Sequence, residues 1–281
     1  MNEPFTDVQE KLLADRALPL RARVLAIANQ KGGVGKTTTA INLGTALAAC
    51  GKRVLIVDMD PQGNASTGLG IAANHRGRGT YEALIDGLPL ASATIDAKIP
   101  GLSVVASSVD LMGAEVELMS LARREYRLRD ALALVRDDYD YILIDCPPAL
   151  GFLTLNALVA ADSVMVPLQA EFYALEGLSH LLRTVERVKR AFNAGLSIQG
   201  IVLTMFDRRN NLCDMVAADV RAHLGTKVFE TVIPRNVRVS EAPSHGKPVL
   251  LYDHRCAGAQ AYIHLAGEML RREQNNMQAL S

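Results

Sequence analysis

Short, almost uniformly apolar runs recur along the chain, and helical periodicity fills the stretches between them. Apolar runs of this length are typical of strands that are buried on both faces of a sheet. We predict six such strands, in RVLAIAN (23–29), RVLIVDMD (53–60), YDYILIDCPP (139–148), ADSVMVPLQ (161–169), IQGIVLTMFD (198–207) and KVFETVIPR (227–235). The predicted helices cover TTTAINLGTALAACG (37–51) and residues 81–86, 115–135, 177–192, 215–223 and 257–272.

Strands that alternate with helices predict right-handed crossovers, and therefore an α/β fold with a mostly parallel central sheet and helices on both faces. The chain contains no internal repeat, low-complexity tract or Pro/Gly/Ser linker, so we expect residues 23–281 to form one domain. Residues 1–22 are predicted to be a flexible or lightly docked arm, with a short helix in VQEKLLADRAL that ends near Pro19.

Composition narrows the class of protein. Lys and Arg together number 30, as do Asp and Glu, so no global field attracts nucleic acid or an anionic membrane, and such binding would need a local patch. The four cysteines have no C-x-x-C spacing, which argues against a zinc site and for reduced thiols. No apolar run approaches the ~20 residues that span a bilayer, and the acidic N-terminus lacks a signal-peptide core. We therefore expect a soluble cytoplasmic protein.

The stretch ANQKGGVGKTTTA (28–40) is close to a phosphate-binding loop but departs from the common form G-x-x-x-x-G-K-[ST]. Gly35, Lys36 and Thr37 match the end of that motif, whereas Gln30 stands at its first glycine and a second lysine, Lys31, follows. The loop joins a predicted buried strand to a predicted helix, which is the context that a phosphate loop requires. Its backbone N–H groups and the helix N-terminus are therefore expected to face phosphate oxygens.

Within this loop, each polar residue has an expected role. Lys36 should contact the β- and γ-phosphates of a nucleotide, and Thr37 should place its hydroxyl on Mg²⁺. The residues expected to surround the nucleotide phosphates are Lys31, Gly32, Gly33, Val34, Gly35, Lys36, Thr37 and Thr38.

Three aspartates follow predicted strands. Asp58 and Asp60 end the second strand, and alternation places both on one side of it, at the C-terminal edge where ligands bind in open α/β sheets. Either carboxylate could hold a magnesium water or orient the attacking water in phosphoryl transfer; for Asp58 the alternative is a helix cap or a turn contact. Asp145 follows four apolar residues in YILIDCPP, a Walker B arrangement, and is expected to hold the Mg²⁺ shell through water.

Five blocks of sequence together resemble the ParA/Soj chromosome-partitioning ATPases: KGGVGKTTTAINLG, VDMDPQGNASTGLG, YDYILIDCPPALG, EFYALEGLSHLL and VIPRNVRVSEAPSHGKPVLLYD. The similarity runs from about residue 23 to residue 270, in the order and spacing of the family. The first two blocks are shared by the wider group of ATPases with a deviant Walker A loop. EFYALEGLS and IPRNVRVSEAPS are much more specific to partition proteins.

The resemblance implies a weak ATPase that forms an ATP-dependent sandwich dimer with Mg²⁺. Lys31 matches the signature lysine of the family, which reaches across the interface to the partner's nucleotide, and Asp60 matches the catalytic aspartate that positions water. Lys31, Lys36 and Asp60 are then the catalytic residues, with the cation supplied in trans balancing charge as an arginine finger does. Gly32 matches the point where two phosphate loops approach, so a side chain there should obstruct dimerisation. The family also implies stimulation of hydrolysis by ParB, a protein bound at centromere-like DNA sites.

Adenine recognition in the family comes from the ends of the fifth and sixth strands. This implies Met205 or Phe206 on one side of the base, and Pro234 and Asn236 on the other. An apolar pair at a strand end can equally belong to the core, and the sequence leaves these two interpretations open.

The dimer of this family binds double-stranded DNA without sequence preference, which implies a cytoplasmic, nucleoid-associated protein. Residues 179–250 carry eleven Lys and Arg against six Asp and Glu, and a basic face of this kind can neutralise several DNA phosphates. Arg209 and Arg238 match positions where family members carry DNA-contacting residues. Further candidates on the same surface are Arg208, Arg235 and Lys247.

Other classes share the expected fold. A MinD-like ATPase that regulates division ends in a basic amphipathic helix on the membrane, whereas the tail AYIHLAGEMLRREQNNMQALS ends too polar to insert well, so we expect no membrane partner. Metabolic and electron-transfer relatives such as the nitrogenase iron protein need cluster cysteines, which the isolated cysteines do not supply. A related ATPase that positions another cargo, such as chemoreceptor arrays or carbon-fixing compartments, is the closer alternative.

Overall fold

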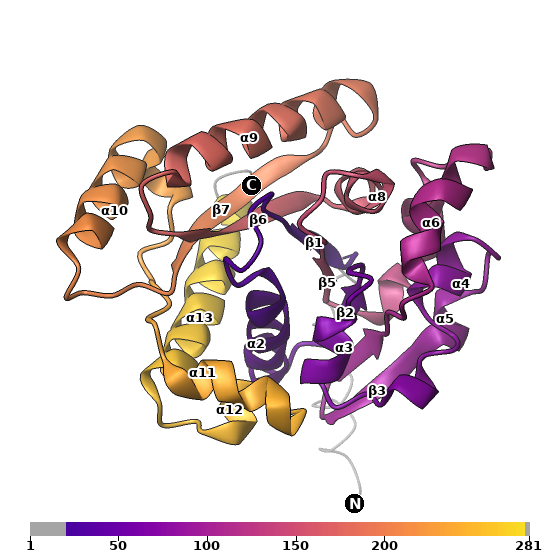
Figure 1. The fold of residues 1–281 in the computed structure, drawn as a ribbon, viewed down its shortest axis with the longest axis horizontal. Helices are drawn as coiled ribbons and strands as arrows, with labels where there is room; N and C mark the ends of the chain where they lie inside the picture. The colour runs from indigo at the N-terminus through magenta and orange to yellow at the C-terminus, as the bar shows by residue number, and fades with distance from the viewer. Residues whose placement is uncertain (1–20, 279–281) are drawn as a thin grey trace, which may run out of the picture.

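The computed structural model describes residues 21–278 of the chain, and their strands form a seven-stranded sheet. The strand order is β3-β4-β2-β5-β1-β6-β7, and neighbours run parallel except β3 and β4, which are antiparallel (Figure 1). The predicted α/β class with a mostly parallel sheet is confirmed. The strand bounds are β1 Arg23–Ile27, β2 Val54–Asp58, β3 Thr94–Ile99, β4 Leu102–Val105, β5 Tyr141–Asp145, β6 Ser163–Gln169 and β7 Ser197–Thr204.

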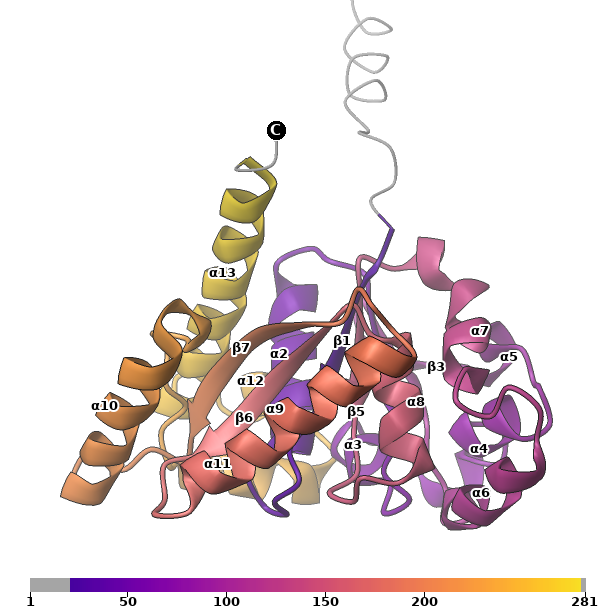
Figure 2. The same ribbon diagram turned by 90° about the horizontal axis from the view of Figure 1, so that it is seen from above.

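Helices cover both faces of the sheet (Figure 2). One face packs against α2 Lys36–Ala49, α3 Asn64–Gly68, α12 Val249–Tyr252 and α13 Ala257–Gln278. The other packs against α4 Thr80–Leu84, α5 Leu90–Ala93, α6 Leu111–Glu117, α7 Arg127–Ala133, α8 Phe152–Ala160, α9 Ala174–Ala191 and α10 Asn211–Leu224. The remaining short helices are α11 Val237–Glu241, η1 Ala73–His75, η2 Leu118–Ser120, η3 Arg136–Asp138, η4 Gly225–Lys227 and η5 Ala242–His245.

The central strands are apolar along most of their length because both of their faces are covered, and charged residues such as Arg23 and Asp145 stand at strand ends. In β1, Val24 and Ala26 belong to the core on one face, and Leu25 and Ile27 belong to the core on the other. Such strands read as continuous hydrophobic runs instead of alternating ones. On the α2 side, a Cβ atom at Gly44 would lie 2.9 Å from Ile56 Cδ1, so the missing side chain lets α2 pack closely on β2.

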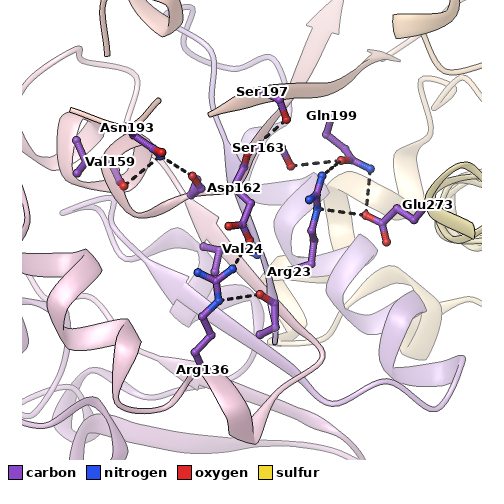
Figure 3. A network of polar contacts seen from close by, with 12 residues as sticks. Arg23, Val24, Arg136, Val159, Asp162, Ser163, Asn193, Ser197, Gln199 and Glu273 are labelled. Atoms are coloured by element: carbon purple, nitrogen blue, oxygen red, sulfur yellow. Dashed lines mark hydrogen bonds and ion pairs between the residues drawn. The ribbon is translucent and has the colours of Figure 1, made fainter. Parts of the chain in front are cut away.

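A polar network joins the N-terminal ends of the strands, at the edge of the sheet away from the phosphate loop (Figure 3). Arg23 Nη2 donates to Gln199 Oε1 over 3.0 Å, and Gln199 Nε2 donates to Glu273 Oε1 of α13 over 3.2 Å. Close by, the guanidinium of Arg136 pairs with the Asp162 carboxylate, which also accepts from Val24 N. The network links β1 to β7, to α13 and to the turn before β6.

The segment 227–235, predicted as a sixth strand, does not form one, and that prediction is wrong. It is joined to β7 and the residues after it by two isolated bridges, Ile201 with Val228 and Phe206 with Pro234, and by a hydrogen bond from Ile233 N to Leu203 O over 2.8 Å. Between these bridges, the N–H groups of Glu230 and Thr231 each donate to the buried carboxylate of Glu268 in α13, over 2.9 Å. Phe229 N and Ile233 N donate to β7, whereas Thr231 N, which lies between them in the strand alternation, donates to Glu268 instead, so the pairing is interrupted.

Replacing Glu268 with alanine should lower the free energy of unfolding by about 2 kcal/mol, because two partly buried backbone donors lose their acceptor. Arg272 would lose its partner at 2.7 Å as well. Urea denaturation monitored by circular dichroism measures the change. Glu268→Gln keeps one acceptor oxygen and should cost less; equal losses in both variants would contradict the role of the hydrogen bonds.

The predicted helix over 115–135 is also wrong as a single element. The helical turns of α6 and η2 end at Ser120, and α7 begins at Arg127. Between them, Asn156 of α8 donates to the carbonyl of Arg124 and accepts from Leu128 N, so an amide side chain satisfies the backbone groups of an interrupted helix.

Sequence periodicity missed the hairpin β3–β4 and the buried helix α8. The β3–β4 turn depends on Gly101 at φ +78°, and the two strands are short and lie at the sheet edge. The helix predicted within 8–18 lies outside the described residues, and the boundary proposed at residue 22 stays a prediction. Within the described part of the chain, no helix combines the length and apolar character needed to cross a bilayer.

Candidate nucleotide-binding site

The candidate phosphate loop lies at the C-terminal edge of the sheet, between β1 and α2. The strand register brings three strand ends together there: Ile27 of β1 pairs with Asp145 of β5, and Asp58 of β2 pairs with Asp145 from the other side. The sequence-predicted Asp58 and Asp145 are therefore neighbours on adjacent strands. This edge is the usual position of ligands in open α/β sheets.

Hydrogen bonds to the neighbouring strands hold the loop in place. Asn29 Nδ2 donates to Pro167 O of β6 over 2.7 Å, and Thr204 Oγ1 of β7 donates to Val34 O over 2.8 Å. Gly35 has φ +88°, a backbone conformation that favours glycine. The conformation of the loop is thus fixed by contacts with two strands.

The two lysines of the loop lie in different surroundings. Lys36 is buried, and its Nζ donates to the carbonyl of Lys31 over 3.0 Å. Burial lowers the pKa of Lys36, while the carboxylates of Asp145 and Asp60 oppose that shift. The Lys31 side chain is half exposed and forms an ion pair with Glu171, which follows β6. Lys36 therefore points into the phosphate site of its own chain, whereas the side chain of Lys31 points out of it toward Glu171.

Asp145 is fully buried, and neither of its carboxylate oxygens has a hydrogen-bond donor in bonding geometry among the described residues. Burial, followed by the charge of Asp58, raises the pKa of Asp145 well above its usual range, and Thr37 and Lys36 oppose this. A buried carboxylate with free lone pairs beside a threonine hydroxyl suits a hydrated divalent cation. Asp145 and Thr37 thus fit the predicted Mg²⁺ shell.

Asp58 and Asp60 differ in how their oxygens are used. Both donors of Ser66 bind Asp58 Oδ2, the backbone N–H over 2.8 Å and the hydroxyl over 2.7 Å, and Asp60 N donates to Oδ1 over 3.2 Å. Burial raises the pKa of Asp58 to about 6, although these hydrogen bonds pull it down. At Asp60, only Oδ1 accepts from a described residue, Gln62 N at 3.0 Å. Asp60 is therefore freer to bind a water.

A cavity of about 230 Å³ adjoins the loop and contains three of the four residues predicted to bind adenine. Met205, Pro234 and Asn236 line it, together with Gly35 and Thr38 of the phosphate loop. Phe206 does not line this cavity; it belongs to the core and to the wall of a different one. Of the alternatives left open at the end of β7, Met205 is thus the one that the structure places beside the phosphate loop.

The predicted DNA-contacting residues are all exposed, and several carry acidic neighbours. Arg209 pairs with Asp207 over 2.9 Å. Arg238 pairs with Glu241 over 3.0 Å and with Asp253 over 3.6 Å. Arg209 and Arg235 line one cavity next to Met205, and Arg208 and Arg209 line another. Arg238 lies on α11 and Lys247 follows η5, so these two occupy the neighbouring part of the surface.

The sequence analysis assigned no role to two glutamates that support the surroundings of the site. Glu171 stands in the quoted block EFYALEGLS, but only the fold reveals that it pairs with Lys31. Glu115 of α6 accepts from Phe152 N over 2.7 Å and Leu153 N over 3.2 Å, and so caps α8 directly after the loop that follows Asp145. No local sequence signal marks such a cap, because its donor and acceptor come from different helices.

A central parallel strand, a glycine loop with two lysines and a Walker B aspartate on the next strand define a P-loop nucleotide-binding protein of the deviant Walker A class. A family model described as an AAA domain matches residues 22–198. The chromosome partitioning protein ParA of Caulobacter vibrioides (strain NA1000 / CB15N) is 63% identical over 255 residues, covering 90% of this chain and 96% of that protein. The sporulation initiation inhibitor protein Soj of Bacillus subtilis (strain 168) is 53% identical over 247 residues, covering 88% and 98%. The chain belongs to the ParA/Soj family of chromosome-partitioning proteins.

Solved structures of other proteins share the fold. Cobyrinic acid a,c-diamide synthase from Mycobacterium smegmatis, solved with bound ADP and magnesium, superposes with a TM-score of 0.80 at 38% identity, covering 91% of this chain and 96% of that one. The cell division ATPase MinD of Pyrococcus furiosus superposes with a TM-score of 0.74 at 27% identity, covering 89% and 99%.

Proposed function

We propose that this protein is an ATP-dependent, DNA-binding dimeric switch that segregates chromosome origins. The observation that carries the proposal is the 63% identity, over 90% of the chain, to a chromosome partitioning protein. The identity to the structurally similar cobyrinic acid a,c-diamide synthase is lower, at 38%, which favours partitioning over a metabolic amidation.

ATP and Mg²⁺ are the proposed ligands. Lys36 neutralises the β- and γ-phosphates from inside the site, Thr37 offers its hydroxyl to the metal, and Asp145 orders the metal's water shell. Magnesium supplies charge neutralisation at the transferring phosphoryl group. Asp60 orients the attacking water through its less committed carboxylate oxygen, and the adenine occupies the cavity of Met205, Pro234 and Asn236.

A second copy of the chain completes the proposed site. Lys31 is half exposed and held outside its own phosphate loop, a position from which a cation can reach the partner's nucleotide. A Cβ atom at Gly32 would meet nothing within 4 Å, so the fold of one copy does not require glycine at this position. In the proposed dimer the phosphate loop of the second copy faces Gly32, and a side chain there would obstruct its approach. These two observations support an ATP sandwich dimer, for which we propose slow hydrolysis.

The dimer then coats the nucleoid through the surface of Arg208, Arg209, Arg235, Arg238 and Lys247, and a ParB-type partner stimulates hydrolysis and release. Two copies double the number of phosphates neutralised, so binding should be steeply salt-dependent. Co-sedimentation with double-stranded DNA tests this proposal, using ATP, ADP or no nucleotide at low and at physiological salt. ATP-dependent, salt-sensitive retention supports it. Retention independent of nucleotide, or recruitment to lipid vesicles instead of DNA, would favour another cargo or a MinD-like role.

Arg238→Glu should abolish most DNA retention while leaving ATP-dependent dimerisation intact. The exposed ion pairs of Arg238 contribute little to the stability of the fold, so the variant should remain folded. Each dimer loses two phosphate contacts, and the slope of log affinity against log salt concentration should therefore fall in magnitude by about two. Fluorescence anisotropy on labelled DNA measures the slope, and light scattering measures the dimer. Arg129→Glu on the distant α7 is the matched control; equal DNA loss in both variants would remove Arg238 from the proposed surface.

A further inference from the structure

Two turns of the chain meet backbone to backbone on the α2 side of the sheet, beside α3 (Figure 1). Gly70 lies just after α3, and Gly246 follows η5. A Cβ atom at Gly70 would lie 2.9 Å from Gly246 O, and one at Gly246 would lie 2.9 Å from Gly70 Cα. Both residues also have positive φ angles, +76° and +60°. Each position therefore favours glycine for two independent reasons, and we call this meeting point the glycine contact.

On one side, the glycine contact leads back to Asp60 through short hydrogen-bonded steps. Asp60 O accepts from Gly63 N over 2.9 Å, and Gly63 O accepts from both the N–H and the hydroxyl of Thr67, each over 2.9 Å. Thr67 O in turn accepts from Gly70 N over 2.9 Å. A displacement of Gly70 is therefore passed through α3 to the turn that holds Asp60.

On the other side, the glycine contact belongs to the segment that lines the candidate adenine cavity. Ser240 of α11 and Pro243 of η5 line this cavity. Gly246 N donates to Pro243 O over 3.0 Å, which ties the second glycine to the cavity wall. The contact thus joins the wall of the adenine cavity to the turn of Asp60.

Both turns are also anchored to α2. A Cβ atom at Gly68 of α3 would lie 2.5 Å from Ile41 Cδ1, so α3 packs directly on α2. After Gly246, Val249 N donates to Asn42 Oδ1 of α2 over 2.8 Å in a buried position. Closely packed elements transmit a displacement to their neighbours instead of absorbing it, so a change at the glycine contact should reach Asp60.

We propose that Gly70 and Gly246 are positioning residues for hydrolysis, a role that rests on the proposed function, in which Asp60 orients the attacking water. Their contact holds α3, and through α3 the turn of Asp60, in the place that the reaction requires. A methyl group at either glycine would push the two backbones apart by up to about 1 Å to reach ordinary contact distance. A misplacement of about 1 Å can slow a reaction about a hundredfold.

A contact that serves the fold alone would behave differently. Loss of packing lowers the melting temperature, but it leaves the hydrolysis rate of the folded protein unchanged. Loss of positioning lowers kcat for ATP, while KM changes little because Lys36 and the phosphate loop are untouched. The two roles are therefore separated by kcat, measured at a temperature where the protein is folded.

The test compares Gly70→Ala with a control that carries the same strain and the same clash elsewhere. Gly101, in the β3–β4 turn, has φ +78°, and a Cβ atom there would lie 3.0 Å from Lys52 O. This turn lies at the N-terminal ends of β2 and β4, at the edge of the sheet away from the phosphate loop. Both variants should melt at a lower temperature than the parent protein, and only Gly70→Ala should lose kcat.

The experiment measures hydrolysis of radiolabelled ATP with Mg²⁺ by the full-length protein, at a temperature where circular dichroism shows every variant to be folded. Gly70→Ala should lower kcat at least about tenfold, with KM for ATP unchanged, whereas Gly101→Ala should keep the parent kcat. Gly246→Ala places the added methyl group on the opposite backbone and should lower kcat in the same way. It keeps the proposal testable if Gly70→Ala does not fold.

Combination with Asp60→Ala shows whether the glycine contact acts through Asp60. Gly70→Ala should slow the parent protein but add nothing to Asp60→Ala, because residues that act as a unit have non-additive effects. Parent-like kcat in the glycine variants, equal slowing by Gly101→Ala, or additive slowing on top of Asp60→Ala would overturn the positioning role and leave the proposed function standing. Rapid hydrolysis by Asp60→Ala itself would refute the water-positioning step of the proposed function, and this inference with it.

Discussion

Lys36→Ala is expected to abolish ATP binding, with an affinity loss of about a hundredfold, because a charge-assisted contact between a buried ammonium group and phosphate is worth up to about 3 kcal/mol. The Lys36 ammonium is buried beside Asp145 and Asp60, so it is the cation that offsets these carboxylates when phosphates enter. Without it, negative phosphates would meet uncompensated negative charge. Isothermal titration calorimetry with Mg²⁺ and ATP measures the loss, and circular dichroism checks that the fold persists.

Lys31→Ala is the matched control for this prediction. It removes the other lysine of the same loop, whose side chain pairs with Glu171 outside the site. A single chain should therefore still bind ATP, while ATP-dependent dimerisation measured by light scattering should fall. Normal ATP affinity in Lys36→Ala would refute the phosphate assignment, and equal affinity loss in both variants would refute the division of roles between the two lysines.

The parts of the fold that were predictable are those in which local pattern and burial agree. The strands β1, β2, β5, β6 and β7 are apolar at most positions because helices cover both faces, and their runs stand out in the sequence. Long helices such as α9 and α13 carry one apolar stripe each, so periodicity located them, although both extend beyond the predicted bounds.

The two elements that were predicted wrongly share a physical cause, which is a backbone group satisfied by a distant side chain. Glu268 takes the N–H donors of the segment 227–235, and Asn156 satisfies the interrupted turn between α6 and α7. Neither contact has a signature within a short window of sequence. Thr231 and Glu268 lie 37 positions apart along the chain, and Leu128 and Asn156 lie 28 positions apart. Propensity and periodicity describe local preference, which such contacts override.

In the candidate site, too, some features follow from local sequence and others depend on contacts between distant parts of the chain. The motif located the phosphate loop and Asp145, because the chemistry of phosphate binding requires a local arrangement of glycines, lysine and threonine. Only the tertiary structure separates Met205 from Phe206, since one lines the cavity and the other packs into the core. The tertiary structure likewise distinguishes Asp58 from Asp60, which alternation along the strand places on the same side. Asp58 accepts two hydrogen bonds from Ser66, whereas the Asp60 carboxylate accepts one, from Gln62 N, and keeps one oxygen without a donor among the described residues.

That difference between the two aspartates leads to the expectation that Asp60→Ala traps an ATP-bound dimer on DNA. Hydrolysis should fall by about a hundredfold or more, the usual effect of removing a group that positions or activates a reacting water, while ATP binding persists because Lys36 and the loop are untouched. The structural cost should be small, since the Asp60 carboxylate accepts only from Gln62 N among the described residues. Phosphate release, measured together with DNA retention after dilution of free protein, reports both effects in one experiment.

Asp58→Ala distinguishes loss of chemistry from loss of structure in this experiment. It removes the acceptor of both Ser66 donors in a buried site, so it should lower the melting temperature clearly, whereas Asp60→Ala should melt close to the parent protein. Hydrolysis must therefore be compared at a temperature where both variants are folded. If Asp60→Ala turns ATP over rapidly, or leaves DNA as fast as the parent, Asp60 does not position the water, and the less committed carboxylate oxygen seen in the structure has no part in the reaction.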